Sequence, residues 1–236
     1  MTRRRWIADE VSGNCAALIG QNARHLARVL RARIGQEFDI ACDHSVRLGR
    51  ITSVEDNRVE FELGEETTAA EESDIRLVLA IFKFDRLEWT IEKATELGVS
   101  KILPVIAQRT DSHLATAAAK RVERWRKIAH EAAQQSRRTV EPEIDSAVKL
   151  NAALAQIPKS ATRIVLAETE KSVMLAEVVA GSAEPIILAV GPEGGWTADE
   201  LDLFKRAGWT SASLGPTILR AETAVVAGLA IARALR

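Results

Sequence analysis

The strongest structural signal in the sequence lies in residues 186–224, which read IILAVGPEGGWTADELDLFKRAGWTSASLGPTILRAETA. Residues 186–190 are a short apolar run rich in β-branched side chains, which is typical of a buried strand. The run stops at the loop 191–195, GPEGG, whose glycines let the backbone approach a ligand closely or turn with positive φ. Thr197 and Glu200 have the spacing of a capping box, so we predict that a helix begins here.

The same arrangement occurs a second time in this stretch. Residues 210–214 are another candidate strand, which stops at Gly215-Pro216, and the next helix is expected from about residue 220. Parallel strands end at one edge of a sheet, where α/β folds bind ligands, so we expect both loops to form one active site. A single loop of this kind is an ordinary connection. The pattern is neither G-x-G-x-x-G nor G-x-x-x-x-G-K-[ST], so a dinucleotide fold and a P-loop are not predicted.

The two loops resemble the RsmE family of bacterial methyltransferases, which modify N3 of one uridine in 16S ribosomal RNA of the small subunit. EWTIEKATELGVSKILPVIAQRT (residues 88–110) and WRKIAHEAAQQSRR (residues 125–138) also resemble that family, in the same order. The family belongs to the SPOUT superfamily. The resemblance implies an α/β fold: a parallel-sheet methyltransferase domain with a C-terminal trefoil knot, residues 71–236, preceded by a small PUA-like β-barrel domain, residues 1–70. Pattern rules alone would give an unknotted doubly wound sheet.

The resemblance also implies a cofactor and the residues that hold it. The cofactor is S-adenosyl-L-methionine, held by three loops, of which the first follows a strand at residues 163–167. The implied cofactor-binding residues are Leu166, Ala167, Glu168, Gly191, Pro192, Glu193, Gly194, Gly195, Leu214, Gly215, Ile218, Leu219, Thr223 and Ala224. The family forms homodimers through the knotted domain, and the apolar, Ala-rich helix expected at residues 222–235 agrees with burial on more than one side.

Methyl transfer to N3 of uracil sets its own chemical demands. The protein must hold two reactants in line and exclude water, and it must stabilise the charge that appears when N3 loses its proton. We assign that stabilisation to Arg220, with Glu222 holding it in place; the alternative is a structural ion pair at a helix start. The proton acceptor stays open among Glu193, Arg109 and solvent.

Basic residues are concentrated in two parts of the chain. Residues 1–50 hold nine Lys and Arg against five Asp and Glu, and residues 101–140 hold nine against three, although the whole chain has a net charge of −1. Such sorting creates local positive fields, which are the expected footprint of an RNA-binding protein. Residues 51–75, with one Arg against nine acids, are interpreted as a solvated face. The predicted RNA-binding residues are Arg4, Arg28, Arg31, Arg109, Gln135 and Arg138, of which Gln135 and Arg138 match the family's basic segment.

Periodicity predicts the remaining elements. Short strands are expected at residues 38–40, 46–48 and 59–63, with a turn at residues 56–57, as in a small barrel. A helix at residues 25–31 would place Arg24, Arg28 and Arg31 on one face, for RNA or simply for solvent. An acidic linker is expected at residues 65–74. The second domain is expected to contain strands at 76–82 and 99–107, and helices at 87–97 and 118–138.

Several classes of site and protein are not favoured. Cys15, Cys42 and the four scattered histidines have no metal-ligand spacing, and two cysteines give no disulfide framework. The absence of a long apolar run or a signal-type segment leads us to expect a cytoplasmic protein without a membrane span. Two other functions stay open: a non-catalytic RNA-binding assembly factor, which would not bind S-adenosylmethionine, and a small-molecule nucleotide enzyme, whose binding would depend little on salt.

Overall fold

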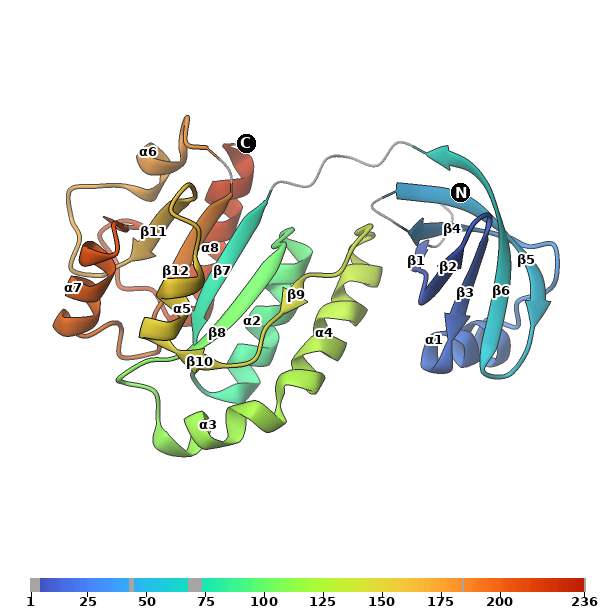
Figure 1. Ribbon diagram of the computed structural model, residues 1–236, viewed down its shortest axis with the longest axis horizontal. Helices are drawn as coiled ribbons and strands as arrows, with labels where there is room; N and C mark the ends of the chain where they lie inside the picture. Colours follow the sequence, from blue (N-terminus) through green and yellow to red (C-terminus); the bar gives the residue numbers. More distant parts are fainter. Residues whose placement is uncertain (1–4, 43–44, 68–73, 184, 236) are drawn as a thin grey trace. The chain divides into compact units, whose positions relative to one another are not determined.

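The structure is a computed structural model that describes residues 5–42, 45–67, 74–183 and 185–235 (Figure 1). Contacts divide the chain into two compact units: Met1–Glu71 with Ala133–Glu141, and Glu72–Ala132 with Pro142–Arg236. Arg4 of the predicted RNA contacts lies outside the described residues. Within the described ranges, no helix is both long enough and apolar enough to cross a membrane.

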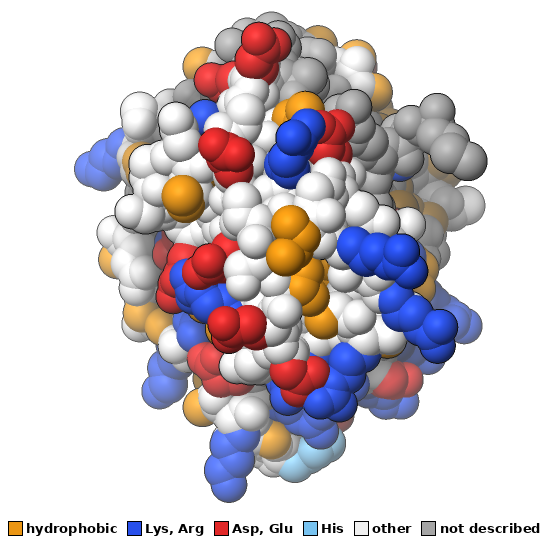
Figure 2. All heavy atoms as spheres, turned by 90° about the vertical axis from the view of Figure 1, so that its right-hand side faces the viewer, with side chains coloured by type: hydrophobic (Ala, Val, Ile, Leu, Met, Phe, Trp, Pro, Cys, Tyr) orange, Lys and Arg blue, Asp and Glu red, His pale blue; other side chains and the backbone are white. Residues whose placement is uncertain are grey.

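The face drawn in Figure 2 exposes charged side chains of both signs. Lys and Arg side chains are frequent along its right-hand and lower margins, and Asp and Glu side chains are interspersed with other Lys and Arg side chains over the rest of it. A small group of hydrophobic side chains is exposed near the centre. The net charge of −1 therefore conceals local fields of both signs.

The N-terminal unit is a six-stranded mixed sheet in the order β1-β4-β5-β6-β3-β2. The strands are β1 (Arg5–Ile7), β2 (Glu10–Ser12), β3 (Cys15–Ile19), β4 (Glu37–Cys42), β5 (Ser45–Val54) and β6 (Arg58–Thr67). The amide of Ala8 donates to the carbonyl of Ala41 in β4, and the amide of Asp9 donates to the carbonyl of Ala17 in β3. These strands lie near opposite ends of the strand order, so two consecutive residues link the two ends of the sheet. This closure agrees with the predicted barrel, and the predicted strands and turn are confirmed.

The helical segment of this unit differs from the prediction. It consists of α1 (Gly20–Arg24) and a π-helical turn, η1 (His25–Val29), and Arg31 has φ of 51°, so the helix ends before it. The expectation that Arg24, Arg28 and Arg31 share one helical face is therefore wrong. The amide of Leu30 donates to the carbonyl of His25, an i→i+5 bond that widens the turn and breaks the i, i+4, i+7 alignment.

The C-terminal unit contains a parallel sheet in the order β10-β8-β7-β12-β11-β13, with β9 beside β8. The strands are β7 (Ile75–Ala80), β8 (Lys101–Ile106), β9 (Glu143–Ile144), β10 (Val148–Lys149), β11 (Thr162–Leu166), β12 (Ile186–Val190) and β13 (Thr210–Ala212). Alternate residues of β7 enter two separate cores: Leu77 and Leu79 on one face, and Val78 and Ala80 on the other. Burial on both faces is typical of parallel sheets.

Helices cover both faces of this sheet (Figure 1). They are α2 (Phe84–Glu96), α3 (Ser112–Ala117), the 3-10 turn η2 (Ala118–Lys120), α4 (Val122–Gln135), α5 (Leu150–Gln156), α6 (Leu175–Val179), α7 (Ala198–Arg206) and α8 (Ala221–Ala234). The single helix predicted at residues 118–138 is wrong at both ends. The chain changes to 3-10 geometry at residues 118–120, which lets Leu114, Ala118 and Trp125 enter one core.

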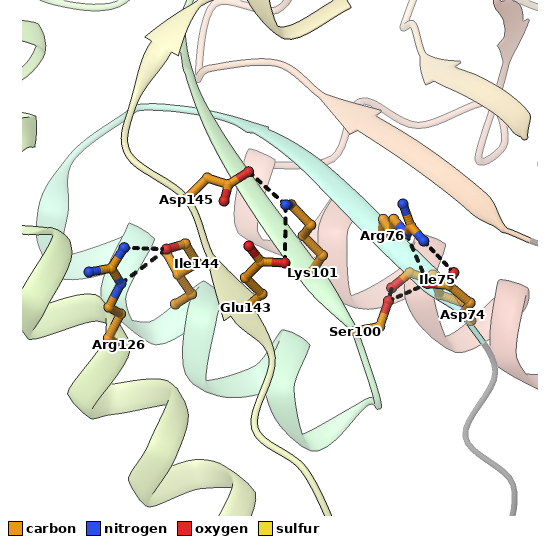
Figure 3. A network of polar contacts seen from close by, with 9 residues as sticks. All are labelled: Asp74, Ile75, Arg76, Ser100, Lys101, Arg126, Glu143, Ile144 and Asp145. Carbon is orange, nitrogen blue, oxygen red and sulfur yellow. Dashed lines mark hydrogen bonds and ion pairs between the residues drawn. The ribbon is translucent and has the colours of Figure 1, made fainter. Parts of the chain in front are cut away.

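The acidic linker prediction, residues 65–74, is wrong at both of its ends. Residues 65–67 continue β6, and Asp74 accepts hydrogen bonds from Arg76 (2.6 Å) and Ser100 (2.6 Å); residues 68–73 lie outside the described ranges. Figure 3 shows that Asp74 belongs to a polar network at the amino edge of the sheet, in which Lys101 lies between Glu143 and Asp145. This network ties β7, β8 and β9 together at the edge opposite the predicted active site.

Candidate functional site

The loops that follow β11, β12 and β13 line a single pocket at the carboxyl edge of the parallel sheet. Its volume is about 810 Å³ when the space at its open mouth is included. The order of the sheet explains this convergence, because β11 lies between β12 and β13 and all three run parallel. The strand ends predicted to lie together are therefore neighbours.

Twelve of the fourteen predicted cofactor-binding residues line this pocket, namely Leu166, Ala167, Glu168, Gly191, Pro192, Glu193, Gly195, Leu214, Gly215, Ile218, Leu219 and Ala224. Gly194 and Thr223 do not line it. Nine further lining residues were not predicted: Thr169, Lys171, Val190, Trp196, Leu201, Ala212, Ser213, Thr217 and Ala221. Most of these flank predicted positions, whereas Leu201 reaches the pocket from α7 and no local pattern marks it.

The first loop is shaped by one carboxylate. Oε1 of Glu170 accepts hydrogen bonds from the amides of Lys171 (2.9 Å), Ser172 (2.7 Å) and Val173 (3.1 Å). These bonds, those from Ser172 and Val173 above all, lower the pKa of the Glu170 carboxyl from its ordinary value of 4.5. The carbonyl of Val173 in turn accepts a hydrogen bond from the amide of Ser213, so the first loop is bonded to the third.

The second loop is a tight glycine turn. The amide of Gly195 donates to the carbonyl of Pro192 (2.8 Å), and Gly195 has φ of 69°, which L side chains adopt only with strain. At Gly191 a Cβ atom would meet the backbone of Gly195 and Trp196 at 3.2 Å. The guanidinium of Arg109, after β8, donates to the carbonyl of Gly194. Arg109 thus lies at the same edge of the sheet as the pocket, where it supports the second loop.

The capping box after this loop is confirmed. Thr197 is the N-cap of α7, and Oε2 of Glu200 accepts a hydrogen bond from the Thr197 amide (2.9 Å). The other carboxylate oxygen of Glu200 accepts one from the amide of Gln108 (2.8 Å), beyond β8. Glu200 is buried, so a single carboxylate joins the start of α7 to the end of a strand far away in sequence.

The third loop leaves backbone donors unused. The hydroxyl of Ser213 accepts a hydrogen bond from the amide of Gly215 (3.2 Å) and thereby shapes the turn. In the part of the chain that the structure describes, the amides of Thr217, Ile218 and Leu219 have no hydrogen-bond partner. Together with the apolar walls from Leu166, Val190 and Leu214, these donors suit a flat, polar-edged ligand.

Arg220 and Glu222 lie beside the pocket but do not form the predicted pair. Arg220 is the N-cap residue of α8, and its exposed side chain has no ion pair among the described residues. The side chain of Glu222 is 14% exposed, and its Oε1 lies 3.8 Å from Nη1 of Arg86 on α2. The prediction that Glu222 holds Arg220 is therefore wrong, because Arg86 is its partner.

The predicted RNA contacts fall into different environments. The guanidinium of Arg28 forms a bidentate ion pair with Asp56, which raises the pKa of Arg28 and lowers that of Asp56. Arg31 and Gln135 are exposed. Arg138 is only 7% exposed, and this burial argues against its predicted role as an RNA contact. No group of His, Cys, Asp and Glu that could hold a metal ion is found among the described residues.

Comparison with known protein families matches almost the whole chain. Residues 69–233 match the family described as an RNA methyltransferase domain, and residues 18–64 match the one described as an RNA methyltransferase PUA domain. The first match contains all three loops of the pocket, and the second contains most of the N-terminal sheet.

Individual proteins resemble the chain over nearly their full length. It is 30% identical to ribosomal RNA small subunit methyltransferase E of Aquifex aeolicus, over 95% of this chain and 96% of that protein. The protein of the same name from Bacillus subtilis is 32% identical, over 88% and 85% of the two chains. A crystal structure of ribosomal RNA small subunit methyltransferase E from Neisseria gonorrhoeae, bound to S-adenosyl methionine, superposes with a TM-score of 0.88 at 31% identity, covering 100% of this chain and 98% of that one.

Proposed function

This chain belongs to the RNA methyltransferase family that includes ribosomal RNA small subunit methyltransferase E, and from that membership we propose that it methylates N3 of one uridine in 16S ribosomal RNA. The chain is an S-adenosylmethionine-dependent ribosomal RNA methyltransferase. The identity of the base and of the ring atom is our proposal.

The observation that carries the proposal is the pocket made by three neighbouring strand ends. Its apolar walls fit the faces of an adenine ring. The amides of Thr217, Ile218 and Leu219, which have no partner among the described residues, fit the hydrogen-bonding edge of that ring or a carboxylate. The glycines of the second loop bring the backbone itself to the pocket wall. We propose that these loops hold S-adenosylmethionine.

Bound S-adenosylmethionine supplies an electrophilic methyl group. The part of the protein is to hold the uracil in line with that group and to exclude water. We assign to Arg220 the stabilisation of the negative charge that develops on the uracil when N3 loses its proton, because Arg220 stands in the chain between the pocket-lining residues Leu219 and Ala221 and has no competing ion pair among the described residues. Arg109 is a poor proton acceptor because a guanidinium stays protonated, which leaves Glu193 and solvent.

The remaining expectations belong to the same proposal. We propose that residues 71–236 form the methyltransferase domain, that its C-terminal strands are threaded into a trefoil knot, and that two copies pair through this domain. Residues 1–70 would be the PUA-like domain that helps to hold RNA. The cytoplasm, where small subunits are assembled, is the proposed location.

The decisive experiment is transfer of a labelled methyl group from S-adenosylmethionine to small ribosomal subunits that lack the modification. Naked 16S ribosomal RNA is assayed in parallel, and the labelled base is mapped. We expect label at N3 of a single uridine. A preference for subunits over naked RNA would place the reaction late in assembly.

Binding of S-adenosylmethionine, measured separately by calorimetry, distinguishes the ways in which the proposal could fail. If the protein binds S-adenosylmethionine but transfers no labelled methyl group to the subunits or to 16S ribosomal RNA, its substrate is another RNA. Failure to bind the cofactor would favour a non-catalytic RNA-binding assembly factor on the same fold.

A further inference from the structure

A short segment of the N-terminal unit exposes apolar and basic side chains together. In this basic-apolar segment, residues 24–34, the side chains of Val29, Leu30 and Ile34 are 66%, 39% and 70% exposed. Arginines stand at positions 24, 28, 31 and 33, between or beside them. Figure 2 shows that hydrophobic side chains and Lys and Arg side chains are open to solvent on the same face of the molecule. An exposed apolar group of this kind commonly marks an interaction surface.

The basic-apolar segment is anchored to the rest of its unit by buried side chains and backbone hydrogen bonds. The buried side chains of Leu26 and Ala32 anchor it in the core of the unit. The amide of Ala32 donates to the carbonyl of Leu26 (3.1 Å), and the amide of Gly35 donates to Ile51 of β5 (2.8 Å). The π-helical turn and the left-handed Arg31 are uncommon geometries that frequently occur at functional sites. The exposed apolar side chains are thus presented by an anchored backbone.

The charged side chains of the segment are all positive. Residues 20–36 contain four arginines and no acidic residue. Asp56 neutralises Arg28, whereas the guanidinium groups of Arg31 and Arg33 have no ion pair or hydrogen bond within the described chain. Two guanidinium groups that lack a partner among the described residues therefore flank the exposed apolar side chains, and the complementary partner is a polyanion that also offers apolar faces.

We propose that the basic-apolar segment docks on unpaired nucleotides of the RNA substrate, with Val29, Leu30 and Ile34 against base faces and Arg31 and Arg33 on phosphates. This proposal rests on the proposed RNA methyltransferase function and identifies the surface outside the pocket that holds the substrate. Unpaired bases expose the faces that a duplex hides, and aliphatic side chains are used as wedges against bases. Arg28, by contrast, is engaged with Asp56 and is not part of this contact.

The two kinds of contact differ in their dependence on salt, and this difference provides the test. RNA affinity is measured by fluorescence anisotropy with full-length protein and a 16S ribosomal RNA transcript, over a series of salt concentrations. V29S/I34S removes apolar side chains, and R31Q/R33Q removes charges. Matched controls are Val11→Ser, in which an exposed valine of β2 is replaced, and Lys159→Gln with Arg206→Gln, which remove exposed cations of the other unit.

We expect V29S/I34S to raise the Kd for RNA roughly tenfold, equivalent to about 1.4 kcal/mol, at every salt concentration. R31Q/R33Q is expected to lower the slope of log Kd against log salt by about 1.4, since each lost phosphate contact removes about 0.7. Single-stranded oligonucleotides should compete with the transcript, and a perfect duplex of equal length should not. The controls should bind RNA as the wild type does.

Three results would overturn the proposal while leaving the proposed function intact. These are wild-type RNA affinity in V29S/I34S, equal competition by duplex and single strand, or a changed sedimentation coefficient without a changed Kd, which would make the segment a protein contact. Binding of S-adenosylmethionine, measured for each variant, should be unchanged and shows that the variants are folded. If the wild type neither binds RNA nor methylates it, the proposed function itself fails.

Discussion

The two side chains assigned to catalysis, Arg220 and Glu222, stand on either side of the pocket-lining residue Ala221 in the chain. Arg220 begins α8 with an exposed guanidinium, and Glu222, two residues on, turns instead to Arg86. One oxygen of Glu222, Oε2, is buried and has no hydrogen-bond partner in the described structure. A buried carboxylate oxygen without a hydrogen bond is unfavourable. The positive charge of Arg86, which lies 3.8 Å from the other oxygen, offsets part of this cost.

Replacement of Arg220 by alanine should lower turnover and leave the fold intact. Loss of a charge-assisted hydrogen bond costs about 1.5 to 3 kcal/mol, which corresponds to roughly 10- to 150-fold in rate. The melting temperature should stay near that of the wild type, because Arg220 makes no ion pair with the described residues. Single-turnover methylation with saturating RNA measures the effect, and Arg206→Ala serves as the control. Wild-type turnover in Arg220→Ala would refute the assignment.

The carboxylate of Glu170 should make cofactor binding sensitive to acid. Its pKa is lowered in the folded protein, so its contribution to the loop is present above about 4.5 and is lost as the pH falls through the lower folded value. We expect the wild-type affinity for S-adenosylmethionine to fall in that acidic window. Glu170→Gln should bind the cofactor more weakly at neutral pH and show no such fall, as measured by calorimetry between pH 7 and the acid limit of folding.

The same acid titration of Glu177→Gln provides the comparison for Glu170. Glu177 caps α6 through the amide of Met174 but does not line the pocket. Equal pH dependence in wild type and Glu170→Gln would show that another group titrates.

At the level of helices and strands, Glu200 of the capping box joins helix α7 to the segment that follows strand β8. Glu200→Ala would leave the amides of Thr197 and Gln108 without their acceptor and should lower the free energy of unfolding by about 1 to 3 kcal/mol. Urea denaturation measures this loss. Asp202→Ala, on the exposed side of the same helix, should cost much less. Equal costs for the two variants would mean that the buried bonds of Glu200 contribute little.

Elements with strong local signals could be predicted from the sequence. The apolar run of β12 and the Thr197–Glu200 spacing at α7 depend on neighbours in the chain, and both are confirmed. The π-helical turn and the 3-10 break at residues 118–120 could not be predicted in this way. Each segment packs through a buried side chain, Leu26 or Trp125, into a core whose other members lie far away in sequence, and local patterns do not report such packing.

The candidate site shows the same division between local and distant information. Glycine loops mark the pocket in the sequence because backbone conformation is a local property. The pairing of Glu222 with Arg86 joins residues far apart in the chain, and no spacing rule reveals it. The burial of Arg138 likewise depends on packing around it, so a basic cluster read from the sequence did not distinguish it from the exposed Gln135.

For the whole molecule, cofactor binding should stabilise the two units unequally. All residues that line the pocket belong to the C-terminal unit. S-adenosylmethionine at 100 times its Kd should stabilise that unit by about 2.7 kcal/mol. Hydrogen exchange should therefore slow in residues 166–173, 190–196 and 212–219, and it should stay unchanged in β3 and β5. Equal protection of both units would show that they unfold together.

The N-terminal unit is discontinuous in the chain, because Ala133–Glu141 packs with Met1–Glu71. The guanidinium of Arg5, in the first segment of this unit, donates a hydrogen bond to the carbonyl of Arg137, in the second segment. Synthesis on the ribosome proceeds from the amino end, so residues 1–71 leave the ribosome first. About sixty further residues must be synthesised before residues 133–141, the last segment of this unit, become available. A nascent chain halted before residue 133 would therefore carry this unit incomplete, and protease resistance of its first 71 residues should increase only once residue 141 has left the exit tunnel.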